Sequence, residues 1–341
     1  ESELERMQET RDIALRNLGQ YLSADHLDIY VATSMRNDAD FVSVNQFVKG
    51  LFNHPKIRSL KLRYFNPTQS WIDDRIAKGL VEALMLRRAS LTIYMAQKSD
   101  TFGKDSEASV ALGQGKPVIV YVPKLALPQG SLDTESLSRR TRQELIQLLD
   151  PEERKEIDEG IDDQAILSKI LTSKIGKLND DEMSETVRAH WSDFDLYFET
   201  ERILDQVQRA EYRQWLDLTI KDNKKNPEIL KKIRADLVGI LVANTVRFEN
   251  RARLFREIHP LALQVVLSTG VLNGILVVRS VEQCAAVLES LVKNRLDLEL
   301  KKDAHNYRLI ELNTGSTIRV ISRHRLLRHA FQAFYGSLKN R

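Results

Sequence analysis

The chain has 341 residues, which corresponds to about two domains of average size. Its content of 42% hydrophobic and 29% charged residues is close to the globular average and excludes a chain that is disordered throughout. The net charge of +3 is too small to indicate nucleic-acid binding by itself, and the single cysteine, Cys284, excludes a disulfide scaffold and a multi-cysteine zinc site.

The N-terminal segment is charged and contains no apolar core, so we expect no signal peptide. We also expect no membrane-spanning helix, because no run of about 18 apolar residues occurs. Together with the single cysteine, these features predict a cytoplasmic protein without a membrane partner. The first residue is not Met, which leaves open whether the chain is a piece of a longer product.

Residues 1–22 have the periodicity of an amphipathic helix, and beyond them four short apolar stretches alternate with stretches of helical periodicity. The strands are expected at Leu27–Ala32, Leu60–Phe65, Leu91–Ala96 and Val118–Val122, with helices at about 39–53, 71–88 and 105–114. This alternation predicts an α/β fold with a parallel sheet and helices on both faces. Ligands bind such sheets at the carboxyl ends of the strands, so the residues that follow each strand are the first candidates for a site.

The second half of the chain has a different pattern. Residues 126–257 are predicted to form a mainly helical segment, and residues 258–341 a small α+β module. The expected elements of that module are strands at about 274–278, 296–300, 307–312 and 317–321 and a helix at 281–294. The predicted organisation is therefore an N-terminal helix (1–26), an α/β domain (27–125), a helical segment (126–257) and a C-terminal module (258–341).

Glu107 is the candidate catalytic residue. It follows the third predicted strand, in the first turn of a helix that Asp105 or Ser106 is expected to cap after a backbone turn at Gly103. A carboxylate at the mouth of a parallel sheet is suited to act as a nucleophile or to stabilise a cation. The alternative is that Glu107 only complements the helix dipole.

Two sequence blocks resemble known enzymes. Gly103 lies four residues before Glu107 and GKPV begins eight residues after it, a spacing that resembles the nucleoside 2-deoxyribosyltransferase-like family. The first strand and its continuation, DIYVATSMR, are similar to that family and to Toll/interleukin-1 receptor (TIR) domains, a related flavodoxin-like group. The resemblance covers about residues 27–123 and departs from the transferase pattern at Lys104, where Thr is usual. It implies a flavodoxin-like fold with Glu107 as the catalytic carboxylate.

The chemistry that this resemblance implies is cleavage of an N-glycosidic bond. The transition state has oxocarbenium character, so a carboxylate beside the anomeric carbon stabilises it or traps it covalently. The acceptor is water in a hydrolase and another base in a transferase. Nicotinamide leaves NAD as a neutral group and needs no general acid, and the only histidine within residues 27–123, His54, lies away from the predicted site. We therefore expect an NAD(+) nucleosidase-like hydrolase that uses NAD or a related nucleotide as substrate and needs no cofactor.

Further polar residues are candidates for substrate binding because they follow strands or neighbour Glu107. They are Thr33, Ser34, Arg36, Asn66, Trp71, Asp73, Asp100 and Ser106. The alternatives are an ion pair of Arg36 with Asp38 or Asp40, a core position for Trp71, and helix capping by Asp73 or Asp74. Glycine-rich phosphate motifs do not occur, which is evidence against a Rossmann dehydrogenase or a P-loop ATPase, and the histidine spacing predicts no metal site.

The basic segment 319–341 carries arginines interleaved with aromatic residues and lacks acidic side chains. Such a segment is a candidate for binding nucleic acid or an acidic protein partner, and the alternative is an amphipathic helix that packs on the core. The resemblance implies a toxic effector of a bacterial anti-phage defence system, controlled by its C-terminal half or by homo-oligomerisation. A non-catalytic nucleotide-sensing or assembly module and a nucleoside deoxyribosyltransferase are the alternative functions.

Overall fold

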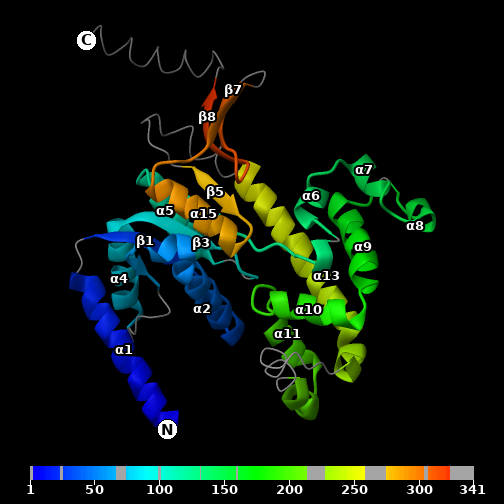
Figure 1. The fold of residues 1–341 in the computed structure, drawn as a ribbon, viewed down its shortest axis with the longest axis horizontal. Helices are drawn as coiled ribbons and strands as arrows, with labels where there is room; N and C mark the ends of the chain where they lie inside the picture. The colour runs from blue at the N-terminus through cyan, green and yellow to red at the C-terminus, as the bar shows by residue number, and fades with distance from the viewer. Residues whose placement is uncertain are drawn as a thin grey trace.

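The computed structural model describes residues 3–23, 26–66, 74–98, 101–130, 132–158, 160–212, 227–257, 274–302 and 306–322. Its centre is a five-stranded sheet in the order β2-β1-β3-β4-β5, in which all neighbouring strands are parallel (Figure 1). The strands are β1 (Leu27–Ala32), β2 (Tyr64–Phe65), β3 (Ala89–Met95), β4 (Val118–Tyr121) and β5 (Ile275–Val278). The predicted α/β fold with a parallel sheet is thereby confirmed.

The strand order reverses between β1 and β3, which are direct neighbours. Chain order runs outward from β1 to β2 on one side and from β3 to β5 on the other. In doubly wound sheets of this order, ligands bind at the carboxyl ends of the two strands that flank the reversal. The loops after Ala32 and Met95 therefore define the expected site.

Helices cover both faces of the sheet, because successive residues of a strand point to opposite faces and nearly all residues of these strands are apolar. Tyr30 packs in one buried cluster with α4 (Arg75–Arg88), α5 (Phe102–Gly113) and α13 (Pro227–Glu257). Its neighbours Ile29 and Val31 pack in a second cluster, on the other face, with three further helices. These helices are α2 (Asp38–Asn53), α3 (Pro55–Arg58) and α15 (Val281–Val292).

The helical segment is an insertion between the fourth and fifth strands. It comprises a short 3-10 turn, η2 (Pro128–Gly130), and α6 (Thr134–Ser138), α7 (Arg142–Ile146), α8 (Pro151–Lys155), α9 (Asp163–Gly176), α10 (Asp180–His190), α11 (Leu196–Ile203) and α13. In Figure 1, the long helix α13 runs between the sheet and α6 to α9, whereas α10 and α11 lie near its lower end, where α11 contacts α2. α13 therefore belongs to both parts of the molecule.

The expected module boundary at residue 258 differs from the structure. β5 pairs with β4 along its whole length, from Val118↔Ile275 to Tyr121↔Val278, and α15 packs against α2 and α3. The continuous apolar run ILVV is buried on both faces, which is typical of a strand in a parallel sheet covered by helices on both sides, although β5 lies at the edge of this sheet. Residues 275–292 thus complete the α/β domain that begins at residue 27.

The C-terminal strands form a separate antiparallel sheet in the order β6 (Leu298–Lys302), β7 (Asn306–Glu311) and β8 (Ser316–Ser322). Buried Glu311 orders the turn between β7 and β8 by accepting hydrogen bonds from the backbone N–H of Asn313 and Thr314, at 3.1 and 2.8 Å. The small sheet is anchored to the large one where the Val277 N–H donates to Ser316 Oγ at 2.9 Å. Most of the basic segment, residues 323–341, lies outside the described residues.

The second strand and the first helix differ from the prediction in extent and in burial, respectively. The strand expected at Leu60–Phe65 is reduced to Tyr64–Phe65, because Leu60 ends the turn after α3 and Lys61 adopts a left-handed conformation with φ of 50°. The first helix, α1 (Glu3–Ser23), forms as predicted, but Ile13 and Leu15 remain exposed and it projects from the body of the molecule (Figure 1).

Candidate active site

Glu107 lies on α5, which leaves the carboxyl end of β3. The helix begins three residues earlier than predicted, because the side chain of Thr101 accepts a hydrogen bond from the Lys104 N–H and provides the N-cap. Gly103 is therefore an ordinary helical residue without a positive φ. The acidic residue of the first turn is Asp105, whereas Glu107 lies one turn further on, where the helix dipole has little influence.

The carboxyl group of Glu107 is held by a tyrosine from the neighbouring strand. Tyr30 Oη donates to Glu107 Oε1 at 2.9 Å, and the Tyr30 side chain is fully buried in β1. Glu107 itself remains partly exposed. The contact joins β1 to the helix after β3, so Glu107 is placed at the reversal in strand order.

The surroundings of Glu107 favour its neutral form. Burial raises the pKa of Glu107 to about 7, and the nearby carboxyl of Glu82 acts in the same direction. The hydrogen bond from Tyr30 and the positive charge of Lys104 act in the opposite direction. A carboxyl group of this kind changes its charge near neutral pH, which is a property of many catalytic acids and nucleophiles.

Lys104 is a buried cation beside this carboxyl group. Its side chain is 1% exposed, Nζ donates to the backbone oxygen of Met95 at 2.8 Å, and it lies 4.9 Å from the centre of the Tyr94 ring. Burial lowers the pKa of Lys104 to about 8. The position at which the chain departs from the transferase pattern thus contributes positive charge to the site.

Gln97 connects the loops that follow β1 and β3. Its Oε1 accepts from the Ser34 N–H at 2.6 Å, and its Nε2 donates to Ser34 O at 2.9 Å and to Asp40 Oδ1 at 3.0 Å. The second oxygen of Asp40 accepts from the Arg36 N–H at 2.8 Å. Since Gln97 and Asp40 are both buried, these bonds give residues 34–36 a defined conformation.

Three predicted binding groups lie on this loop. The buried hydroxyl oxygens of Thr33 and Ser34 have no hydrogen-bond partner in the part of the chain that the structure describes. Arg36 is exposed, and its guanidinium makes no ion pair with any described residue, because Asp40 is bound to the backbone of the loop instead. The loop after β1 therefore offers two hydroxyls and one cation at the carboxyl end of the sheet.

The other predicted site residues are placed differently. Asn66 is fully buried after β2, and Ser106 Oγ donates to Phe102 O within α5 at 2.8 Å. Asp74 caps α4 by accepting from the Ala77 N–H at 2.7 Å, as the capping alternative predicted for it. Trp71, Asp73 and Asp100 lie outside the described residues.

A second set of contacts comes from the insertion. Arg251 on α13 donates to Gln97 O at 2.7 Å and to Tyr94 Oη at 3.1 Å. Tyr94 in turn donates to Asp105 Oδ1 at 2.6 Å. Sequence reasoning missed Tyr30, Tyr94, Gln97 and Arg251. The two tyrosines carry the only signal, a hydroxyl inside an otherwise apolar strand, because a buried hydroxyl needs a polar partner.

Other kinds of site find little support in the described residues. Among them, no group of three His, Cys, Asp or Glu side chains is arranged to hold a metal ion. Cys284 is fully buried, and burial raises the pKa of its thiol, so it is not an activated nucleophile. No described helix combines the length and apolar character needed to cross a lipid bilayer.

The arrangement brings three features together at the carboxyl ends of β1 and β3, where the strand order reverses. They are the titratable carboxyl group of Glu107, the buried cation of Lys104, and the loop after β1 with its available hydroxyl and guanidinium groups. This arrangement can stabilise positive charge on a sugar carbon and bind anionic or hydroxyl groups nearby. Two cavities are formed by described residues elsewhere in the molecule, and Glu107 lines neither of them. Comparisons with models of protein families, with curated proteins and with solved structures gave no match.

Proposed function

We propose that the protein is an N-glycosidase that cleaves the N-glycosidic bond of NAD or a related nucleotide. The observation that supports this function is the partly exposed carboxyl group of Glu107, which Tyr30 Oη holds at 2.9 Å beside the reversal in strand order. In its ionised form, Glu107 stabilises the oxocarbenium character of the anomeric carbon as the base leaves. The acceptor is water, and the products are nicotinamide and ADP-ribose.

The surroundings fit a substrate with a cationic leaving group and phosphates. The positive charge of the bound nicotinamide ring favours the ionised form of Glu107, whose pKa in the free protein is about 7. The exposed guanidinium of Arg36 can bind a phosphate with two parallel hydrogen bonds, and the hydroxyls of Thr33 and Ser34 can bind ribose. Nicotinamide leaves without protonation, so the proposal needs no general acid.

We further propose that the enzyme is a toxic effector of bacterial anti-phage defence. An enzyme that destroys NAD must be restrained until it is needed. The insertion supports such control, because α13 contacts Gln97 and Tyr94 at the candidate site.

The test is the NAD content of cells that express the full chain. We expect NAD to fall with the natural sequence and not with Glu107→Gln, which keeps the size of the side chain but removes its charge. Glu289→Gln, at a partly exposed carboxylate paired with Lys293 on α15, is the matched control and should still deplete NAD. A Glu107→Gln protein that depletes NAD as fast as the natural one contradicts the proposal.

A nucleotide-binding module without chemistry is the second candidate. It is favoured by the hydroxyls of Thr33 and Ser34 and the exposed guanidinium of Arg36 on the loop after β1, which can bind a nucleotide without any reaction. Incubation of the purified chain with NAD, NMN and deoxynucleosides, followed by chromatography of the released bases, separates the two candidates. Base exchange between deoxynucleosides would instead identify a nucleoside deoxyribosyltransferase.

A further inference from the structure

A cavity of about 530 Å³ lies within the insertion, between the ends of α6, α7 and α9 and the second half of α13. Its volume is in the range of small-molecule sites, which is about 300–1,000 Å³. It shares no lining residue with the candidate active site. Four arginines line it, namely Arg139, Arg140, Arg253 and Arg256.

The carboxylates in the wall of the cavity are already neutralised from outside it. Glu249 is paired with Arg279 at 2.6 Å, and both side chains are 2% exposed. Asp163 is paired with Arg142 at 3.2 Å. Neither Arg142 nor Arg279 lines the cavity, so both acids are paired with arginines outside its wall.

Two arginines of the wall share a single carboxylate. Arg139 and Arg256 both bind one oxygen of Glu135, at 2.8 and 2.6 Å. Arg140 is exposed and makes no ion pair with any described residue. The cavity therefore has an excess of positive charge, and its guanidinium groups present paired N–H donors.

We propose that this cavity binds a small phosphate-bearing ligand of nucleotide size. Guanidinium groups bind phosphate oxygens through two parallel hydrogen bonds, and the gain is larger inside a cavity than on an open surface. Leu145 and Leu167 supply an apolar wall for a flat ring, and the amides of Gln164 and Asn250 supply donors and acceptors for its edge. Phosphate groups and a heterocycle are therefore both recognised.

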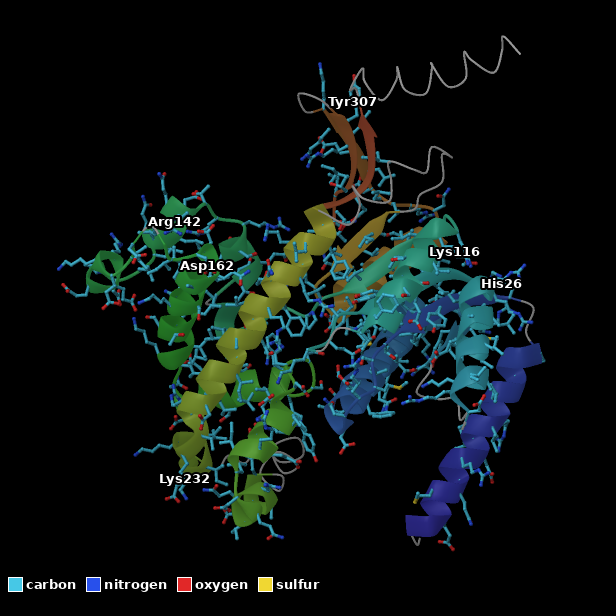
Figure 2. The ribbon with its side chains drawn as sticks, turned by 180° about the vertical axis from the view of Figure 1, so that it is seen from behind. His26, Lys116, Arg142, Asp162, Lys232 and Tyr307 are labelled. Atoms are coloured by element: carbon cyan, nitrogen blue, oxygen red, sulfur yellow. The ribbon has the colours of Figure 1, made fainter. Side chains whose placement is uncertain are left out.

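The cavity and the candidate active site lie on the same helix. Glu249, Asn250, Arg253 and Arg256 of α13 line the cavity, while Arg251 donates to Gln97 O and Tyr94 Oη at the edge of the sheet. The segment that carries Arg142 lies on the far side of α13 from the sheet, as Figure 2 shows. A ligand in the cavity thus contacts the helix that supports the candidate site, but binds through different residues.

The test is isothermal titration calorimetry of the full chain with ADP, inorganic pyrophosphate and adenosine as probes. All titrations are performed with Arg36→Ala, so that phosphate binding at the candidate active site is weakened. We expect ADP and pyrophosphate to bind, ADP more tightly, and adenosine to bind at least ten-fold more weakly than ADP. Added salt should weaken both phosphate-bearing probes.

Charge reversal identifies the site. Adding Arg140→Glu and Arg253→Glu should weaken ADP binding at least ten-fold, and the milder Arg140→Gln should weaken it less. Both arginines are exposed, and a thermal unfolding curve shows whether each variant is folded. The matched control is Lys232→Glu, an equal charge change on the same helix about 25 Å from Glu249, which should bind ADP normally (Figure 2).

Three results would each overturn the proposal. The first is the absence of binding of both ADP and pyrophosphate at millimolar concentration. The second is equal ADP affinity before and after the two charge reversals. The third is adenosine affinity equal to that of ADP, which would show that phosphate is not recognised.

Discussion

Glu249 and Arg279 form a buried ion pair that joins the insertion to the carboxyl end of the sheet. Both guanidinium Nη atoms donate to the carboxylate of Glu249, at 2.9 and 2.6 Å. Arg279 also donates to the backbone oxygens of Val122 and Pro123, which follow β4. One residue thus connects β4, β5 and α13.

Removal of one member of this pair should destabilise the protein strongly. We expect Glu249→Ala to lower the free energy of unfolding by about 3–5 kcal/mol, because it leaves a buried guanidinium without its carboxylate. The double variant with Arg279→Leu should lose less stability than the sum of the two single variants. Urea denaturation of the four proteins measures the coupling, and strict additivity would show that the two residues act independently.

Gly274 should tolerate no side chain. A Cβ atom there would lie 2.5 Å from Cα of Ile318 on β8, and backbone at that distance cannot move aside. We expect Gly274→Ala to lower the free energy of unfolding by about 2 kcal/mol or more. The control is Gly239→Ala in α13, where a Cβ meets nothing within 4 Å and alanine should stabilise the helix by about 0.5–1 kcal/mol. Equal effects of the two variants would contradict this close approach.

Two variants should move the pH dependence of base release in opposite directions. The proposed reaction needs ionised Glu107, so the rate should rise with pH through the pKa near 7. Tyr30→Phe removes a hydrogen bond that lowers this pKa and should shift the rise to higher pH by about one pH unit. Glu82→Gln removes a charge that raises the pKa and should shift the rise to lower pH. Unchanged profiles in both variants would exclude Glu107 as the titrating group.

The same carboxyl group should make stability depend on pH. The folded protein holds the proton of Glu107 up to a pH of about 7, whereas a glutamate in the unfolded chain has a pKa of 4.5, so the folded state binds more protons between these two pH values. Stability therefore falls as pH rises through this window, by up to about 3 kcal/mol for this group. Glutamine cannot ionise, so the variant Glu107→Gln does not lose this stability. The free energy of unfolding of the variant minus that of the natural protein should therefore be larger at pH 8 than at pH 5. Urea denaturation at both pH values measures this difference, and a difference of the opposite sign would contradict the buried position of Glu107.

Local sequence was sufficient to predict most of the fold. Short apolar runs such as LDIYVA and VIVYV identify buried strands, and β1 spans the predicted residues. Helix starts were less accurate, since Thr101 rather than Asp105 or Ser106 caps α5. Capping depends on which polar side chain reaches a free N–H group, and several adjacent residues in this segment have the required chemistry.

The candidate site was predicted only in part. The loop of Thr33, Ser34 and Arg36 and the position of Glu107 follow from the rule that strand ends carry the site. The residues that hold them do not follow from that rule. Tyr30 is 77 residues from Glu107, and Arg251 is 157 residues from Tyr94, so no local pattern relates these partners.

The sequence by itself determined where the strands and helices form and that a carboxylate follows the third strand, because periodicity and propensity act over a few neighbouring residues. Only the tertiary structure decided that β5 completes the first sheet and that α13 supports the candidate site while also lining an arginine-rich cavity. These relationships depend on burial and on pairing between distant segments, and many sequences with the same local pattern would pair differently.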